Sequence, residues 1–191
     1  MRLGVLDPRA PILAALILLG AGLSAAAEGP SINFPGPKCG VTSPDGRYIV
    51  LNVDSQMDAE TRYLGENHAL YLLDLKTPTV KRIHPYGRSV SVLWSPRGSA
   101  LLINDRVGSD SSTVLLVVVG RGAQKIDIGQ QLKKKARERS IVANHHVYIE
   151  GVEWLAENAM KVKVHGYGDL DPNGFELWYE YMVGGAFKRL K

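Results

Sequence analysis

The chain has 191 residues, with 23 lysines and arginines against 19 aspartates and glutamates, and a formal net charge of +4. That length suits one domain with its own hydrophobic core, and so mild a positive charge does not by itself indicate nucleic acid as a partner. The sequence holds one cysteine, Cys39, so no internal disulfide can form and packing must stabilise the fold. A lone thiol of this kind is expected to be buried and inert.

The first 27 residues have the layout of a secretory signal peptide. A short, weakly basic leader precedes an apolar run that ends at Leu23, and Ala25-Ala26-Ala27 supplies the small residues that a signal peptidase requires. The run is about a dozen residues long, whereas crossing the hydrocarbon core of a membrane takes roughly 20. We therefore predict a signal peptide at residues 1–27, cleaved before Glu28, and an exported protein that is periplasmic or extracellular, with no transmembrane segment after cleavage. A retained membrane anchor is the alternative.

Internal repeats are the strongest structural signal in the rest of the chain. Residues 43–52, SPDGRYIVLN, recur as residues 95–104, SPRGSALLIN. In both copies proline and glycine form a tight turn, and an apolar strand ending in asparagine follows it. A third copy keeps Trp154, which matches Trp94 ahead of the second turn, and continues into an alternating strand over residues 160–164.

Each copy continues into a hairpin. Apolar strands at residues 70–75, 114–119 and 177–182 are each followed by a turn and a second strand, and the last two turns contain glycines. The sequence therefore predicts an all-β fold with one domain over residues 28–191. Its units are three four-stranded antiparallel meanders, at about 38–83, 89–128 and 146–190.

The pattern W-S-P-[D/R]-G, an apolar strand, a loop and then Leu-Tyr-Leu-Leu-Asp-Leu at residues 70–75 resembles the blade repeat of TolB-like and WD-type β-propellers. In TolB-like proteins a Ser-Pro-Asp-Gly turn joins the inner strands of a four-stranded blade. The resemblance covers residues 38–190 in three partial copies: the first keeps the whole turn, the second has Arg97 in place of aspartate, and the third keeps Trp154 but loses the Ser-Pro and the glycine. It implies propeller blades and, by analogy with TolB-like envelope scaffolds, a binding role.

Three blades are fewer than the four with which propellers normally close, so strand edges at the ends of the array would be exposed. Residues 28–42 can pair as an extra strand, two chains can complete a six-bladed ring, or the meanders can pack as a compact sandwich. We favour a compact or partial-propeller monomer over the homodimer.

One stretch between the second and third units predicts a short helix. Residues 130–140 are rich in helix-forming residues, and Leu132 and Ala136 would make a narrow apolar stripe. The other faces would carry a basic patch: Lys133, Lys134, Lys135, Arg137 and Arg139. Such a patch can bind anionic lipid, a cell-wall polymer or an acidic partner. A solvated linker helix is the interpretation that we favour.

Residues 169–174, Asp-Leu-Asp-Pro-Asn-Gly, fit the spacing of a calcium-binding loop together with Glu180. An EF-hand requires flanking helices, whereas both flanks here alternate like strands, and Glu180 on an extended strand would lie about 20 Å from Gly174. We therefore favour a plain hairpin turn. The alternative is a weak calcium site of another kind, at Asp169, Asp171 and Asn173; no other cofactor is indicated.

The loops between the second and third strands of the units share one rim, where repeat proteins usually place binding residues. Six of their side chains are predicted to bind a ligand or partner: Asp58, Glu60, Asp110, Tyr167, Asp169 and Asp171. Paired carboxylates on this rim could also serve hydrolysis, but Ser109, Ser111 and Ser112 show no nucleophile-elbow motif. His145 and His146, adjacent on a strand, point to opposite faces, so they cannot chelate one metal ion together.

Two functions from different classes fit these features. The first is an exported, non-enzymatic interaction or scaffold module of the cell envelope, which binds a protein or cell-wall component through the rim loops. The second is a small periplasmic hydrolase or ligand-binding protein that uses the rim carboxylates. We favour the first, because the sequence shows no converging pair of carboxylates. Nucleic acid is not expected as a partner of an exported protein.

Overall fold

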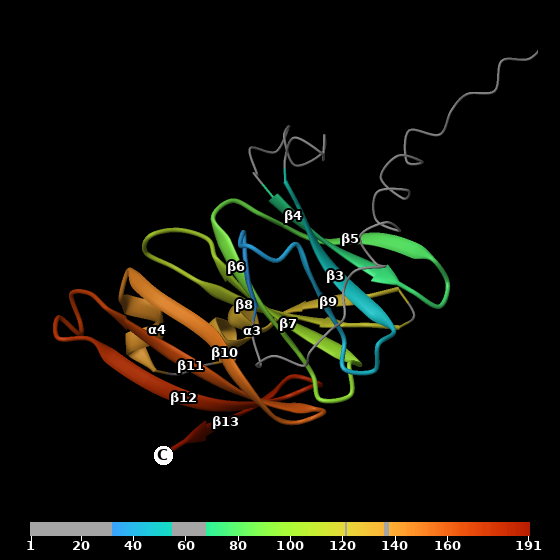
Figure 1. The fold of residues 1–191 in the computed structure, drawn as a ribbon. Coiled ribbons are helices and arrows are strands. Elements are labelled where there is room, and N and C mark those ends of the chain that lie inside the picture. The colour runs from blue at the N-terminus through green and yellow to red at the C-terminus, as the bar shows by residue number, and fades with distance from the viewer. Residues whose placement is uncertain (1–31, 55–67, 121, 136–137) are drawn as a thin grey trace, which may run out of the picture.

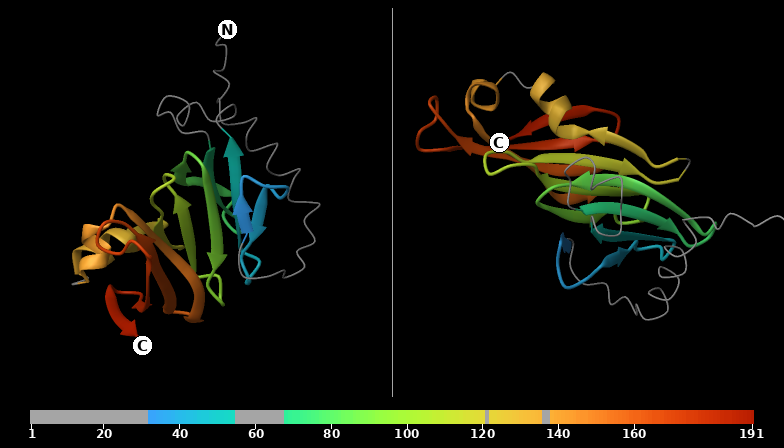
Figure 2. Two further views of the ribbon diagram at one scale, coloured as in Figure 1. Left: turned by 90° about the vertical axis from the view of Figure 1, so that its left-hand side faces the viewer. Right: turned by 90° about the horizontal axis from the view of Figure 1, so that it is seen from above.

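The computed structural model describes residues 32–54, 68–120, 122–135 and 138–191. The expected signal peptide lies outside these ranges. Within them, almost all regular structure is antiparallel β-sheet, in three sheets that follow one another along the chain (Figure 1). Figure 2 shows the sheets fanned side by side with their faces toward one another, as propeller blades are arranged. We call them blade 1, blade 2 and blade 3.

Blade 1 is a meander of four strands, paired in chain order: β2 (Gly40–Thr42), β3 (Tyr48–Asp54), β4 (His68–Asp74) and β5 (Thr79–Tyr86). The Ser-Pro-Asp-Gly motif forms the turn between β2 and β3. There the Gly46 N–H donates to the Ser43 carbonyl at 2.9 Å, and Gly46 has a φ of 71°, a conformation that favours glycine. The Ser43 hydroxyl stabilises the turn from within, since it donates to Asp45 at 2.5 Å and accepts from the Tyr48 N–H at 2.9 Å.

Blade 2 has four strands of its own: β6 (Ser89–Trp94), β7 (Ala100–Arg106), β8 (Thr113–Val118) and β9 (Gln124–Asp127). A fifth strand, β1 (Ile32–Phe34), pairs antiparallel with β6, so the order across the sheet is β1-β6-β7-β8-β9. Of the three arrangements considered for an array of three blades, the structure shows the extra strand. The segment β1, which precedes blade 1 in the chain, pairs with the β6 edge of blade 2.

Two helices connect blade 2 to blade 3, α3 (Ile128–Lys135) and α4 (Arg139–Ala143). The helix expected over residues 130–140 thus begins at Ile128, where the Asp127 carboxylate accepts a hydrogen bond from the Gln130 N–H at 2.7 Å, and a second short helix follows it. Blade 3 pairs its strands in chain order: β10 (His146–Ala156), β11 (Ala159–Tyr167), β12 (Phe175–Met182) and β13 (Ala186–Leu190). The predicted fold class, three four-stranded meanders with a basic helix between the second and third, is confirmed.

Most of the hydrophobic core lies between the blades, in two layers, and a smaller third cluster of Ile49, Leu51 and Leu73 lies within blade 1. Leu101 and Ile103 of β7 belong to the layer between blades 1 and 2, whereas Leu102 belongs to the layer between blade 2 and blade 3, which α3 completes with Leu132. Strand β7 is therefore covered on both faces. This explains its uninterrupted apolar run, since a strand with one face in water would alternate between apolar and polar residues.

Side chains of blade 2 close the edge of β10 that faces away from β11. Asn104 exchanges two hydrogen bonds with the backbone of Gly151, at 2.7 and 2.9 Å. Ser112 does the same with Ile149, at 3.0 and 3.1 Å. A side chain that bonds both the N–H and the C=O of one residue takes the place of a neighbouring strand. At Ile149 and Gly151 this edge therefore has no free backbone N–H or C=O group with which another strand could pair.

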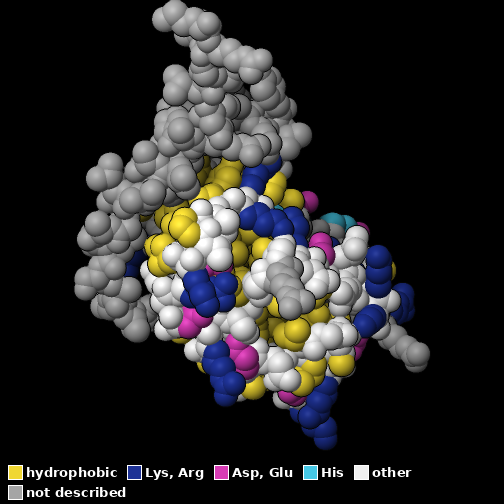
Figure 3. All heavy atoms as spheres, turned by 90° about the vertical axis from the view of Figure 1, so that its right-hand side faces the viewer, with side chains coloured by type: hydrophobic (Ala, Val, Ile, Leu, Met, Phe, Trp, Pro, Cys, Tyr) yellow, Lys and Arg dark blue, Asp and Glu magenta, His cyan; other side chains and the backbone are white. Residues whose placement is uncertain are grey.

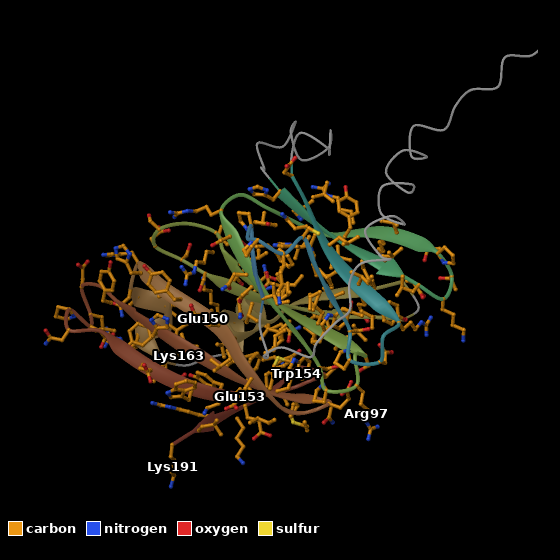
Figure 4. All side chains as sticks on the ribbon, in the orientation of Figure 1. Arg97, Glu150, Glu153, Trp154, Lys163 and Lys191 are labelled. Atoms are coloured by element: carbon orange, nitrogen blue, oxygen red, sulfur yellow. The ribbon has the colours of Figure 1, made fainter. Side chains whose placement is uncertain are left out.

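The outward face of blade 3 carries charges of both signs. Lys163 lies 2.7 Å from Glu176, and Lys161 lies 3.3 Å from Glu153 (Figure 4). The ammonium groups of both lysines also lie over the ring of Trp178, at 5.4 and 4.7 Å from its centroid. Basic and acidic side chains are interspersed in the same way at the end of the molecule seen in Figure 3. No helix within the described residues is long and apolar enough to span a membrane.

Cys39 is exposed, so the expectation of a buried thiol is wrong. The residue lies in the connection from β1 to β2 and belongs to neither of the described core layers between the blades. Its backbone carries the local contact instead, because the Cys39 carbonyl accepts a hydrogen bond from the Asn52 N–H at 2.8 Å.

Candidate functional site: a rim and a groove beside blades 2 and 3

Three segments meet beside α4 at one rim of the molecule: the loop over residues 107–112, the start of β10, and the turn over residues 168–174 (Figure 1). The Val147 N–H donates to the Asp110 carbonyl at 3.2 Å, and the Tyr148 hydroxyl donates to the Ser109 carbonyl at 2.8 Å. These two bonds join a loop of blade 2 to the first strand of blade 3, so the rim is continuous across both blades.

Asn144 fixes the turn of blade 3 onto this rim. Its side-chain oxygen accepts from the N–H groups of Leu170 and Asp171, at 3.1 and 3.3 Å. Its amide nitrogen donates to the Asp171 carboxylate at 2.7 Å and to the Ser140 carbonyl at 3.1 Å. The residue is buried, and its amide uses both donor and both acceptor positions, so it acts as a clamp between α4 and the turn.

The structure places the predicted rim residues in different settings. The ring of Tyr167 stacks on His146 with the centroids 4.3 Å apart. Asp169 is almost fully exposed, with its carboxylate 3.7 Å from His145, whereas the carboxylate of Asp171 is held by the clamp. Asp110 is exposed at the tip of the blade 2 loop. Two further residues of this prediction lie outside the described residues: Asp58 and Glu60.

Apolar side chains reach solvent at this rim. Among the described residues, seven large hydrophobic side chains are exposed, and four of them belong to the segments that form the rim: Val107, Val142, Tyr167 and Leu170. We call these four the rim patch. Val142 is 70% exposed although it belongs to a helix, α4, whose other face buries Ile141. Exposed apolar side chains gathered in one place mark interaction surfaces more often than scattered ones do.

A groove adjoins the rim between the first strand of blade 2 and the outward face of β10. It consists of two hollows, of about 440 and 470 Å³, which share Ser89, Arg106, Ser112 and Glu150 in their linings. One hollow extends along β1, where Asn33 lines it, and the other extends to the blade 2 loop. Together they have the size of a small-ligand site.

The charged groups of the groove are only partly paired. Glu150 lies 3.8 Å from His165, whose ring stacks on Tyr148 with the centroids 5.2 Å apart (Figure 4 labels Glu150). Arg88 and Arg106 line the groove as well, and no described residue is a hydrogen-bond or ion-pair partner of either guanidinium group. Sequence reasoning missed both arginines, because they come together only where β6 starts beside the end of β7.

The predicted calcium loop is a hairpin turn in the structure. The Gly174 N–H donates to the Asp171 carbonyl at 3.0 Å, and Gly174 has a φ of 87°. Within the described ranges, no group of three or more histidine, cysteine, aspartate or glutamate side chains is placed to hold a metal ion. A weak calcium site at Asp169, Asp171 and Asn173 stays a prediction, and the melting temperature with and without calcium tests it.

The described residues of the predicted basic patch are exposed, and one of them also contacts blade 3. Lys133, Lys134, Lys135 and Arg139 are exposed, and Arg137 lies outside the described residues. The ammonium group of Lys135 also donates to the Gly185 carbonyl and lies over the ring of Phe187, 5.9 Å from its centroid. Lys135 thus connects α3 to the turn between β12 and β13. A binding role for the other basic residues stays a prediction.

A buried polar pair that the sequence did not single out lies between blades 1 and 2. His84 of β5 places its Nε2 atom 2.7 Å from the carboxylate of Asp105 on β7, and both residues are buried. Beside the pair, the Tyr86 hydroxyl donates to Asn52 at 2.6 Å. Burial, and less strongly the charge of Asp105, raises the pKa of the Tyr86 hydroxyl well above its ordinary value. The pair connects two blades and does not open onto the groove.

The fold and these interfaces define the chain as a partial β-propeller with three blades, as the sequence resemblance implied. The β-propeller domain of the Trilobed protease from Pyrococcus furiosus, described as having an open velcro topology, is similar with a TM-score of 0.50 and 17% sequence identity. The match covers 81% of this chain and 43% of that one, so this chain spans less than half of its length. A similarity at this identity shows the fold alone.

Two further solved structures match over 81% of this chain. TolB from Acinetobacter baumannii has a TM-score of 0.44 at 14% identity, with 32% of its length covered. An acylaminoacyl peptidase in complex with a chloromethyl ketone has a TM-score of 0.45 at 15% identity, with 25% of its length covered. No protein-family model matches the chain, and no curated protein matches it.

Proposed function

We propose that the protein is an exported, non-enzymatic interaction module of the cell envelope that binds a partner protein or envelope component through the rim of blades 2 and 3. The rim patch carries this proposal, because its four side chains place apolar surface in water at one end of the described structure. Apolar side chains that become covered on binding supply most of the favourable free energy of association.

The construction of the rim supports a binding role. The bonds from Val147 and Tyr148 to the blade 2 loop, and the Asn144 clamp on the blade 3 turn, hold together the segments that carry the patch. A surface that is already ordered loses less conformational entropy when a partner binds. Asp110 and Asp169 are exposed beside the patch and can add polar contacts at its margin, where charged residues influence the choice of partner.

The proposal is tested by crosslinking the tagged protein in its native cells and identifying what is recovered with it. The test variant is Val142→Ser with Leu170→Ser, which removes two apolar side chains of the rim patch. The matched control is Leu75→Ser, a similarly exposed apolar residue of blade 1. We expect one stoichiometric envelope partner that is lost in the rim variant and kept in the control. Equal recovery from both variants would rule out the rim patch as the binding surface.

A further inference from the structure

The groove indicates a more specific ligand than the rim patch does. Arg88 precedes β6 and Arg106 ends β7, and the pairing of Ser89 with Arg106 places the two arginines on neighbouring strands. Neither guanidinium group has a partner among the described residues, and both residues line the same hollow. Guanidinium groups bind carboxylate and phosphate oxygens through paired, charge-assisted hydrogen bonds. Two arginines that line one hollow can therefore bind an oxygen anion there.

Hydroxyl groups and a flat aromatic wall surround these arginines. Ser89 and Ser109 line the hollow on the blade 2 side, and the stacked rings of Tyr148 and His165 line it on the blade 3 side. Serine hydroxyls both donate and accept, so they match ligands that carry many hydroxyl groups. A ring face offers an apolar surface that a sugar ring can cover. This combination of groups fits an acidic sugar.

The backbone around the groove argues against an extended peptide as the ligand. Peptides commonly bind by adding a strand to a sheet edge, which requires unpaired N–H and C=O groups. In β10 those groups at Ile149 and Gly151 already bond to Ser112 and Asn104. Recognition along β10 must therefore depend on side chains, as it does for carbohydrates and small ligands.

We propose that the groove binds an acidic saccharide, with a carboxylate of the sugar on Arg88 and Arg106 and its ring against Tyr148 and His165. This inference rests on the proposed function, since it names an envelope component that the same module would hold beside its protein partner. Glu150 lines both hollows and its carboxylate, 3.8 Å from His165, repels anions, so the sugar carboxylate must bind at the arginines and not beside Glu150.

Calorimetric titration of the full-length protein as recovered from cells tests the proposal, with trigalacturonate as the probe. Maltotriose is the neutral sugar control, and inorganic phosphate and a polyglutamate peptide are the other anions. The test variant is Arg88→Gln with Arg106→Gln. Its matched control, Lys133→Gln with Lys134→Gln, removes the same charge from exposed positions on α3. Circular dichroism confirms that both variants are folded.

We expect trigalacturonate to bind and maltotriose to bind much more weakly. The arginine variant should lose about tenfold or more in affinity, the effect of removing charge-assisted hydrogen bonds, while the lysine variant changes little. No binding of trigalacturonate, or equal binding by both variants, overturns the proposal. Arginine-dependent binding of phosphate or polyglutamate in place of the sugar also overturns it and identifies another anion. The rim variant Val142→Ser with Leu170→Ser should leave sugar binding intact, so failure of one proposal is distinguishable from failure of the other.

Discussion

The carboxylate of Glu157, in the turn between β10 and β11 of blade 3, accepts a hydrogen bond of 2.8 Å from the hydroxyl of Ser95 in blade 2. Its second oxygen accepts from the Arg97 N–H, also at 2.8 Å, and the Ser99 hydroxyl donates to the first oxygen as well. In the corresponding turn of blade 1, the acceptor carboxylate belongs to the turn itself. There Asp45 accepts hydrogen bonds from the Ser43 hydroxyl and the Arg47 N–H. Blade 2 has arginine at that position, and blade 3 supplies the missing carboxylate.

Burial by itself would raise the pKa of Glu157. The hydrogen bonds from Ser99, Ser95 and the backbone outweigh that effect and lower its pKa. The carboxylate is thus held in its charged form and fixes blade 3 onto the turn of blade 2.

Replacement of Glu157 by alanine should therefore destabilise the protein, and an aspartate at position 97 should recover part of the loss. The Glu157→Ala variant leaves the buried Ser95 hydroxyl without its acceptor, at a cost of about 1–3 kcal/mol in the free energy of unfolding. Arg97→Asp would supply a carboxylate within the turn, as Asp45 does in blade 1. Urea unfolding of both single variants and the double variant forms a double-mutant cycle. Strictly additive effects would show that position 97 and Glu157 do not serve the same turn.

The buried pair of His84 and Asp105 should stabilise the interface between blades 1 and 2. Asp105→Ala leaves the His84 ring buried without its partner, which costs about 1–3 kcal/mol. Asp105→Asn keeps the shape and an acceptor oxygen, so it should cost less. Chemical denaturation of the two variants gives the comparison. Equal losses in both would mean that the negative charge of Asp105 is required, and no loss in either would mean that the pair is dispensable.

The blades could be predicted from the sequence because each is local: a turn with proline and glycine and the strand that follows are contiguous in the chain, as in residues 43–52 and 95–104. Contacts between blades could not, since no pattern relates Glu157 to Ser95 or His84 to Asp105. For the same reason the sequence did not predict a site at Arg88 and Arg106, because only the pairing of β6 with β7 brings these two residues together. The sequence did indicate the rim loops and Tyr167, but the other residues predicted there were carboxylates. Of these, Asp171 is bound by Asn144, while Val107, Val142 and Leu170 nearby are exposed.

Loss of the Asn144 side chain should loosen the rim more than the fold. Asn144→Ala removes all four hydrogen bonds that hold α4 against the turn over residues 168–174, while the core layers stay intact. Hydrogen exchange should therefore accelerate at Leu170 and Asp171 and change little in β7. Partner recovery in the crosslinking experiment should fall with it. Uniform acceleration throughout the protein would show instead that Asn144 supports the whole fold.

The protein should be a monomer in solution. Closing a ring with a second chain would bury the outward face of blade 3, where Lys163 pairs with Glu176 and Lys161 with Glu153. Such charges lose hydration when they are buried, and a polar outer face is typical of the terminal unit of a repeat array. Light scattering should give the mass of one chain. The mass of two chains would favour the homodimer, and the blade 3 variant Lys163→Ala with Lys161→Ala would then show whether this face is the contact.

Acid should weaken the ion pair of Arg47, which precedes β3, with Asp74 at the end of β4. The guanidinium donates to both carboxylate oxygens, at 2.9 and 3.3 Å, and these hydrogen bonds lower the pKa of Asp74 to about 2, from an ordinary value of 3.8. The unfolded chain therefore takes up this proton at a higher pH than the folded protein does. The stabilisation is present above pH 3.8 and is lost as the pH falls from there toward 2.

Arg47→Gln removes the guanidinium and should return the pKa of Asp74 toward its ordinary value. The variant should then be less stable than the wild type at pH 6, and the difference between them should shrink below pH 4 and be mostly lost near pH 2. Arg97→Gln, an equal change of charge in the corresponding turn of blade 2, is the control and should show no such pH dependence, because its side chain makes no ion pair with a described residue. Urea unfolding over this pH range measures the difference. A constant difference between Arg47→Gln and the wild type at every pH would assign the effect of Arg47 to packing, for example its position 4.8 Å from the ring centre of Tyr48, and not to the charge of Asp74.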